Sequence, residues 1–100
     1  MGIALNPEND ASVLRLDGVI DVAVAAELKA SLLEAIAAGK AIRVSVDEAA
    51  ELDVAAFQLL WTAGRQATQA GIGFLVTGQM TEAARETLIA MGLDASALSA

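Results

Sequence analysis

Hydrophobic and polar positions follow two different periods along this chain, and segments with one period alternate with segments with the other. Strand-like segments, in which apolar residues alternate with polar ones or form a short run, occur at 3–5, 12–16, 42–46 and 72–76. Helix-like segments, in which apolar residues recur every three or four positions, occur at 21–38, 53–70 and 81–91. The pattern therefore predicts the element order β-β-α-β-α-β-α.

Residues with strong conformational preferences mark the ends of these segments. Side chains that suit a helix N-cap precede the three helical segments at Asp21, Asp53 and Thr81. Glycine, which suits a helix C-terminus, follows them at Gly39, Gly71 and Gly92. We also expect Gly18 to end the second strand, residues 47–51 to form a loop, and residues 94–100 to be a frayed tail beyond a core of 3–93.

This order predicts a single α/β domain with a mixed sheet of about four strands and helices packed on it. The last two strand connections contain a helix each, and such crossovers place the joined strands parallel. The first two strands are close enough in sequence to pair as an antiparallel hairpin. The chain length of 100 residues suits one domain.

The composition removes several kinds of chemistry. The sequence holds no cysteine and no histidine, which excludes disulfides, Cys/His zinc sites and catalysis by either side chain. Hydrophobic residues make up 56% but aromatic ones only 3%, which favours helices packed closely on a sheet over an aromatic ligand cage. The acidic pairs Asp47/Glu48 and Glu51/Asp53 are interpreted as solvated carboxylates rather than a Mg²⁺ site. We therefore predict a protein that is not an enzyme and that uses no metal or other cofactor.

Charge narrows the class of partner. The net charge is −7, and the six Lys and Arg residues are scattered along the chain. Nucleic acids and anionic membranes are bound mainly through clustered Lys and Arg, so neither is expected as a partner. No signal peptide is recognisable at the N-terminus, and no apolar run reaches the roughly 18 residues that span a bilayer. These features predict a cytoplasmic protein without direct membrane insertion.

The helical segment 53–70 carries an apolar face that is wider than core packing requires. Its apolar residues cover about 200° of the helix, whereas a stripe of about 100° is enough to face a core. Phe57 and Trp61 lie toward one rim of this face. Trp61 either closes the edge of the core or anchors a partner, since Trp is enriched among the residues that dominate interfaces.

Three segments, in this order, resemble the STAS domain of anti-sigma factor antagonists. Residues 14–21, Leu-Arg-Leu-Asp-Gly-Val-Ile-Asp, are similar to the family's strand-Gly-x-hydrophobic-Asp segment before the first helix. Residues 52–60, Leu-Asp-Val-Ala-Ala-Phe-Gln-Leu-Leu, resemble its hydrophobic-Asp-Ser/Thr-Ser-Gly-Leu signature at the start of the second helix. Residues 71–78, Gly-Ile-Gly-Phe-Leu-Val-Thr-Gly, resemble the short strand that follows. The resemblance extends over residues 13–93.

The resemblance implies a non-catalytic docking platform for another protein. In the family, the partner surface is the start of the second helix and the loops beside it. With the rim residue Trp61 added, the partner-binding residues predicted here are Asp21, Asp53, Val54, Ala55, Ala56, Phe57 and Trp61. For Asp21 and Asp53 the alternative role is that of a helix N-cap, and a cap that shapes a docking loop serves both.

The sequence departs from the family where switching members are phosphorylated. Val54 stands at the Ser/Thr position, Ala55 at the phospho-acceptor Ser and Ala56 at the Gly. Since Val and Ala have no hydroxyl, phosphoryl transfer to them is chemically impossible, and the usual charge switch cannot act there. Ser45 stands where the family spacing places an Asp at the end of the preceding strand. These departures imply a member held in the unphosphorylated, binding-competent form, or one that signals by another route.

Several functions remain open at this point. The partner implied by the resemblance is a cytoplasmic anti-sigma factor or kinase, or a chemotaxis-type histidine kinase, and residues 53–60 look most like STAS proteins of chemotaxis signalling. The alternative is an accessory subunit of a lipid-trafficking ABC transporter. A third, an enzyme that uses carboxylates, Lys or Ser, is disfavoured because Lys29 and Lys40 fall away from Asp53. Weak homodimerisation is compatible with each of these functions.

Overall fold

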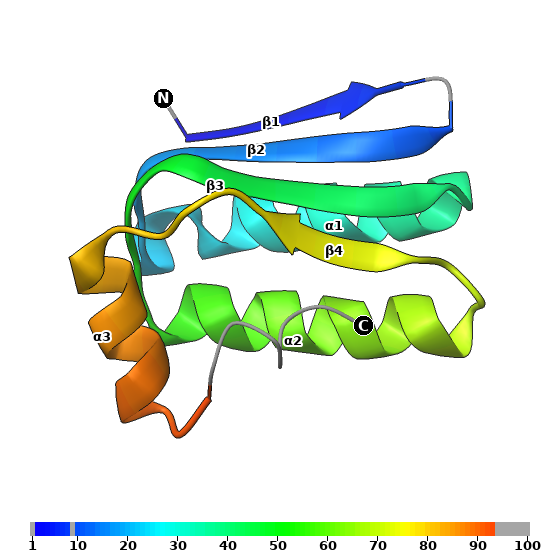
Figure 1. The fold of residues 1–100 in the computed structure, drawn as a ribbon. Helices are drawn as coiled ribbons and strands as arrows, with labels where there is room; N and C mark the ends of the chain where they lie inside the picture. Colours follow the sequence, from blue (N-terminus) through cyan, green and yellow to red (C-terminus); the bar gives the residue numbers. More distant parts are fainter. Residues whose placement is uncertain (1, 9, 94–100) are drawn as a thin grey trace.

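The structure, a computed structural model, describes residues 2–8 and 10–93 (Figure 1). Its elements are β1 (Gly2–Pro7), β2 (Ala11–Ile20), the 3₁₀ turn η1 (Val22–Val24), α1 (Ala25–Ala38), β3 (Ala41–Leu52), α2 (Val54–Gln69), β4 (Phe74–Thr77) and α3 (Glu82–Ala90). This confirms the predicted order of strands and helices. The predicted tail, residues 94–100, lies outside the described residues.

The four strands form one sheet in the order β1-β2-β3-β4. Strand β1 pairs antiparallel with β2, as the predicted hairpin requires, and β2–β3 and β3–β4 pair parallel. The mixed sheet is therefore confirmed. Each parallel connection moves one position in the same direction across the sheet. Because such crossovers are almost always right-handed, α1 and α2 must lie on the same face. In Figure 1, α1 lies behind β3 and β4, and α2 lies below β4.

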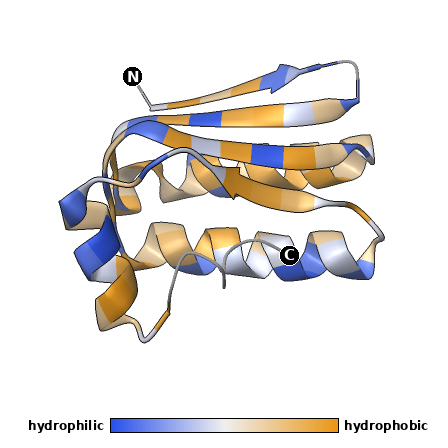
Figure 2. Cartoon of the chain, in the orientation of Figure 1, coloured by the Kyte–Doolittle hydropathy of each residue, from blue (hydrophilic) through white to orange (hydrophobic). Residues whose placement is uncertain are grey.

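The core lies between that face of the sheet and the two helices. Alternate residues of β2 and β3 point into it, among them Leu14, Leu16, Val44 and Val46, all of which are fully buried. Figure 2 shows the alternation along these two strands as bands of hydrophobic and hydrophilic colour. The residues between them, such as Arg15 and Arg43, are exposed on the opposite face. The period of two along these strands thus produces one buried and one exposed face of the sheet.

Three predicted boundaries were wrong. Gly18 does not end β2, and the strand continues to Ile20. Gly18 has a φ of +80° and lies beside register shifts in the β2–β3 pairing, which resumes after it. Residues 47–51 are not a loop, because the irregular register lets β3 keep pairing with β2 as far as Leu52. The last strand starts at Phe74 rather than Ile72. The extra length of β2 and β3 carries both strands to the surface described next.

Within the described residues, no helix combines the length and the hydrophobicity that crossing a membrane demands.

Candidate partner-binding surface

Two helix starts lie side by side where the central parallel strands end. Ile20 and Leu52 are register partners at the ends of β2 and β3. The backbone N–H of Asp53 donates a hydrogen bond to the carbonyl oxygen of Ile20 at 3.1 Å. Both strands are followed by the same three residues, Asp-Val-Ala, at 21–23 and 53–55. The fold therefore places two matching turns next to each other at one edge of the sheet.

Both aspartates of these turns are helix caps. The Oδ1 atom of Asp21 accepts a hydrogen bond from the backbone N–H of Ala23 at 2.9 Å. The Oδ1 atom of Asp53 accepts one from the backbone N–H of Ala56 at 3.0 Å. Each carboxylate thus satisfies an N–H that has no partner within its own helical segment. The predicted capping role is confirmed for Asp53 at α2. Asp21 caps the 3₁₀ turn η1 rather than the first α-helix, which begins at Ala25 with Val24 as its N-cap. A cap leaves contact with a partner open.

The valine after each cap projects into solvent. The side chain of Val22 is 76% exposed and that of Val54 is 47% exposed. We call Asp21, Val22, Asp53 and Val54 the strand-end surface. Val22 was missed in the sequence-based prediction, although the repeated Asp-Val-Ala signal could have identified it. Ala55 is partly exposed beside this surface.

Two of the predicted contact residues are not on the surface. Phe57 is 0% exposed and Ala56 only 1%, because the first turn of α2 directs both side chains into the core. The prediction that Phe57 would offer direct binding energy was therefore wrong. Its place on the rim of the apolar face did not reveal that it belongs to the fully buried core cluster. Phe57 supports the helix start from inside.

Trp61 lies on the outer face of α2. It follows Val54 by seven residues, which brings it back to nearly the same side of the helix, and it is 41% exposed. The guanidinium carbon of Arg65 stands 5.0 Å from the centre of the Trp61 ring, a cation–π contact. A half-exposed, laterally supported indole fits both of the predicted roles, core edge and binding anchor.

A carboxylate on β3 holds the connection between β4 and α3. The Oδ1 atom of Asp47 accepts a hydrogen bond from the backbone N–H of Gln79 at 2.8 Å. A Cβ atom on Gly78 would lie only 2.5 Å from the same oxygen, and Gly78 has a φ of +92°, so the residue must be glycine. In the family an aspartate stands at the end of this strand, and Ser45 occupies that position here. Asp47, two residues later, binds the loop between β4 and α3 through the backbone of Gln79.

Several acidic residues lie near the ends of β2 and β3, but they do not form a cluster. Within residues 2–8 and 10–93, no group of three or more carboxylates is arranged to hold a metal ion.

Comparison with known proteins agrees with this geometry. The family model described as "Mlab, STAS domain" matches residues 3–99. The chain belongs to the STAS domain family. This STAS domain has no match among the curated proteins searched.

Solved structures show the same fold. The STAS domain superposes on the anti-sigma factor antagonist SpoIIAA in its unphosphorylated form with a TM-score of 0.71 at 17% identity, over 80% of this chain and 76% of that one. An anti-sigma factor antagonist from Mycobacterium paratuberculosis gives a TM-score of 0.71 at 18% identity, over 90% and 76% of the two chains. A protein named Mglu gives 0.67 at 18% identity, over 76% of this chain and 19% of that one. At these identities the similarity concerns the fold alone.

Proposed function

We propose that this STAS domain is a non-catalytic regulatory module that binds a protein partner in bacterial signalling, through the strand-end surface and Trp61. The observation that carries the proposal is the pair of exposed valines on adjacent, capped helix starts. Exposed apolar side chains are common singly, but here two follow paired strand ends and a half-exposed Trp stands on the same face of α2. The arrangement offers an apolar centre with two carboxylates at its rim.

The chemistry of such a surface explains its suitability for docking. Interface energy concentrates in a few buried aromatic or aliphatic anchors, which are surrounded by polar groups that exclude water. Trp61 and Val54 would supply the anchors, and Asp21 and Asp53 the rim. The caps also keep the helix starts in one conformation, so little ordering cost is left for binding.

The partner we propose is a cytoplasmic anti-sigma factor or kinase, or a chemotaxis-type histidine kinase. Its complementary surface would be apolar with basic residues at the edge, because the chain has a net charge of −7. The same charge disfavours nucleic acid as a partner.

We further propose that binding is not switched by phosphate at residues 53–57. None of the side chains in this segment has a hydroxyl group. If Ala55 occupies the acceptor position, the docking surface stays permanently in its unphosphorylated form.

Affinity capture with matched variants tests the docking surface. Val54→Glu places a charge in the apolar centre and leaves α2 stable, because an acidic side chain is favourable in the first turn of a helix. Leu75→Glu is the control, since Leu75 is 48% exposed, about as much as Val54, but lies on β4. We expect a kinase or anti-sigma factor to be captured from the native lysate by the wild type and Leu75→Glu, and lost with Val54→Glu and Trp61→Ala. Equal capture by all four proteins would show that the surface is wrongly placed.

The second candidate is an accessory subunit of a lipid-trafficking ABC transporter. A surface without a phosphorylatable hydroxyl also suits a permanent subunit, and the matching family model is named after Mlab. Purification of the tagged chain from detergent-solubilised cells separates the two candidates. Recovery of a membrane ATPase in constant ratio would support the transporter, and recovery of a soluble kinase would support signalling.

A further inference from the structure

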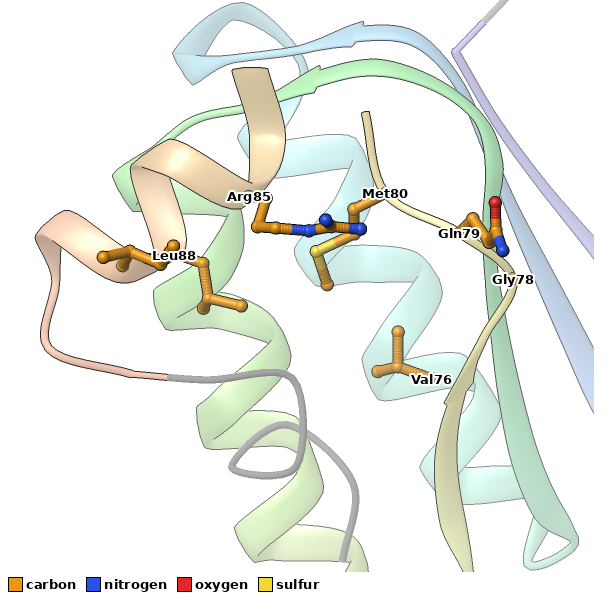
Figure 3. A pocket seen from close by; sticks show the side chains of 7 residues that line it. Val76, Gly78, Gln79, Met80, Arg85 and Leu88 are labelled. Atoms are coloured by element: carbon orange, nitrogen blue, oxygen red, sulfur yellow. The ribbon is translucent and has the colours of Figure 1, made fainter. Parts of the chain in front are cut away.

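A separate cavity lies between the end of β4, the loop that follows it and α3. Its volume is about 300 Å³. Apolar side chains form most of its wall: Val76 from β4, Met80 from the loop, and Leu88 and Ile89 from α3. Figure 3 shows Val76, Met80 and Leu88 arranged around it. The cavity lies at the carboxyl end of β4, and mostly apolar walls with a few polar groups are the usual form of a small-molecule site.

Among residues 2–8 and 10–93, Arg85 is the only charged residue that lines this cavity. In Figure 3 its side chain extends from α3 toward Met80, and both residues line the cavity. Within the part of the chain that the structure describes, Arg85 has neither an ion pair nor a side-chain hydrogen bond, although Glu82 and Glu86 are on the same helix. A guanidinium group whose five N–H donors find no partner among the described residues thus stands at an apolar wall.

The cavity walls are held in place by contacts outside the cavity. The backbone of Gln79 is tied to Asp47, as described above. The hydroxyl of Thr81 donates to the carbonyl oxygen of Ala50 at 2.7 Å and accepts from the backbone N–H of Ala84 at 3.2 Å. The loop and the first turn of α3 are therefore both fixed to the sheet, and the site is preformed.

We propose that this cavity binds a monocarboxylate with a short apolar chain. Arg matches a carboxylate with two parallel N–H···O bonds, and the apolar walls accept the chain. A phosphate carries more charge than one Arg neutralises, and the backbone N–H of Gln79 is already used by Asp47. Since a water molecule occupies about 30 Å³ of liquid, the cavity has room for about ten non-hydrogen atoms. Octanoate has this size and is the probe of choice.

This inference goes beyond the proposed docking function, because the cavity includes no residue of the strand-end surface and no part of α2. The two can fail independently. A ligand site on α3 does not require a protein partner, and the docking variants leave the cavity unchanged.

Titration of the ¹⁵N-labelled full chain with octanoate, followed by NMR, tests the proposal. We expect saturable shifts at the amides of Val76, Met80 and Ile89, with a dissociation constant on the order of 10⁻⁴ M for a ligand of this size. Arg85→Gln should weaken binding about tenfold or more, because a charge-assisted bidentate contact is lost. Arg43→Gln, an exposed Arg on the open face of the sheet, is the matched control and should bind as the wild type does.

Ligand and charge-reversal controls make the outcome decisive. Octan-1-ol, which keeps the chain and lacks the carboxylate, should bind more weakly than octanoate, and Arg85→Glu should prefer octylammonium. Equal affinity for octanol and octanoate, unchanged octanoate binding by Arg85→Gln, or shifts that map away from β4 and α3 would each overturn the proposal.

Discussion

At the scale of single residues, a few side chains fix the loops that surround the strand ends. Asp21 and Asp53 cap two helical segments, and Asp47 holds the loop that leads to α3. Each uses a short carboxylate to satisfy a backbone N–H, which is why none of them can be replaced by an apolar residue without leaving a donor unpaired. The loops beside the sheet therefore depend on three acidic residues that composition alone would treat as solvated charge.

Gly78 gives a prediction at this scale. Gly78→Ala should destabilise the protein by more than Gly39→Ala, by at least about 1 kcal/mol. Both glycines have positive φ, but a Cβ on Gly39 meets nothing within 4 Å, whereas one on Gly78 meets the Asp47 carboxylate. Urea unfolding of the two variants provides the measurement. The double variant Gly78→Ala/Asp47→Ala should lose less free energy of unfolding than the sum of the two single variants, because the clashing carboxylate is gone. A loss equal to that sum would contradict the proposed clash.

Ala55 gives a second prediction. Incubation with an anti-sigma kinase should leave the peptide Asp53–Phe57 of the wild type without phosphate, because it has no hydroxyl. Ala55→Ser should gain a phosphate there, since the residue is partly exposed at the start of α2. Peptide mass spectrometry after the kinase reaction is the measurement. Failure of Ala55→Ser with a kinase that modifies its own substrate would contradict the assignment of the acceptor position.

At the scale of elements, α2 divides its residues between the core and the surface. The inner side carries Phe57 and Leu60, both 0% exposed, and the outer side carries Val54 and Trp61. The helix is anchored at its start by Asp53 and at its inner face by the sheet. This division separates the residues that stabilise the fold from those available to a partner.

The division predicts losses of stability of different size for the two aromatic residues of α2. Phe57→Ala should lower the free energy of unfolding by about 3–5 kcal/mol, because it opens a cavity in the core. Trp61→Ala should cost less than about 2 kcal/mol, since the indole is 41% exposed and its contact with Arg65 is worth about 0.5–1 kcal/mol. Chemical denaturation measures both. A larger loss for Trp61→Ala than for Phe57→Ala would place Trp61 in the core and remove it from the docking surface.

At the scale of the whole molecule, the helices α1 and α2 cover one face of the sheet and leave the other face to solvent. The central strands β2 and β3 are paired on both sides, whereas β1 and β4 are edge strands. Helix α3 packs at the end of β3 and adds little to the main core, apart from the buried Ala84 and Leu88. Stability is therefore concentrated in the middle of the sheet.

Hydrogen exchange should reflect this distribution. We expect the slowest exchange at amides of β2 and β3 near Leu14 and Val44, and faster exchange in β1 and α3, because protection follows burial and double-sided pairing. Measurement by NMR in D₂O at neutral pH checks this order. Protection of β1 equal to that of β3 would mean that the sheet opens only as one unit.

The sequence by itself determined the order of elements, the three N-caps, the mixed sheet and the STAS resemblance. These depend on local periodicity and on backbone donors a few residues away, which are visible in a short window. Only the tertiary structure decided how far β2 and β3 extend, that Phe57 is covered while Val22 is exposed, and that Asp47 meets Gly78. Those outcomes depend on strand register and on neighbours distant in sequence. The same is true of Arg85, since only the fold brings α3, β4 and the loop between them together around one cavity.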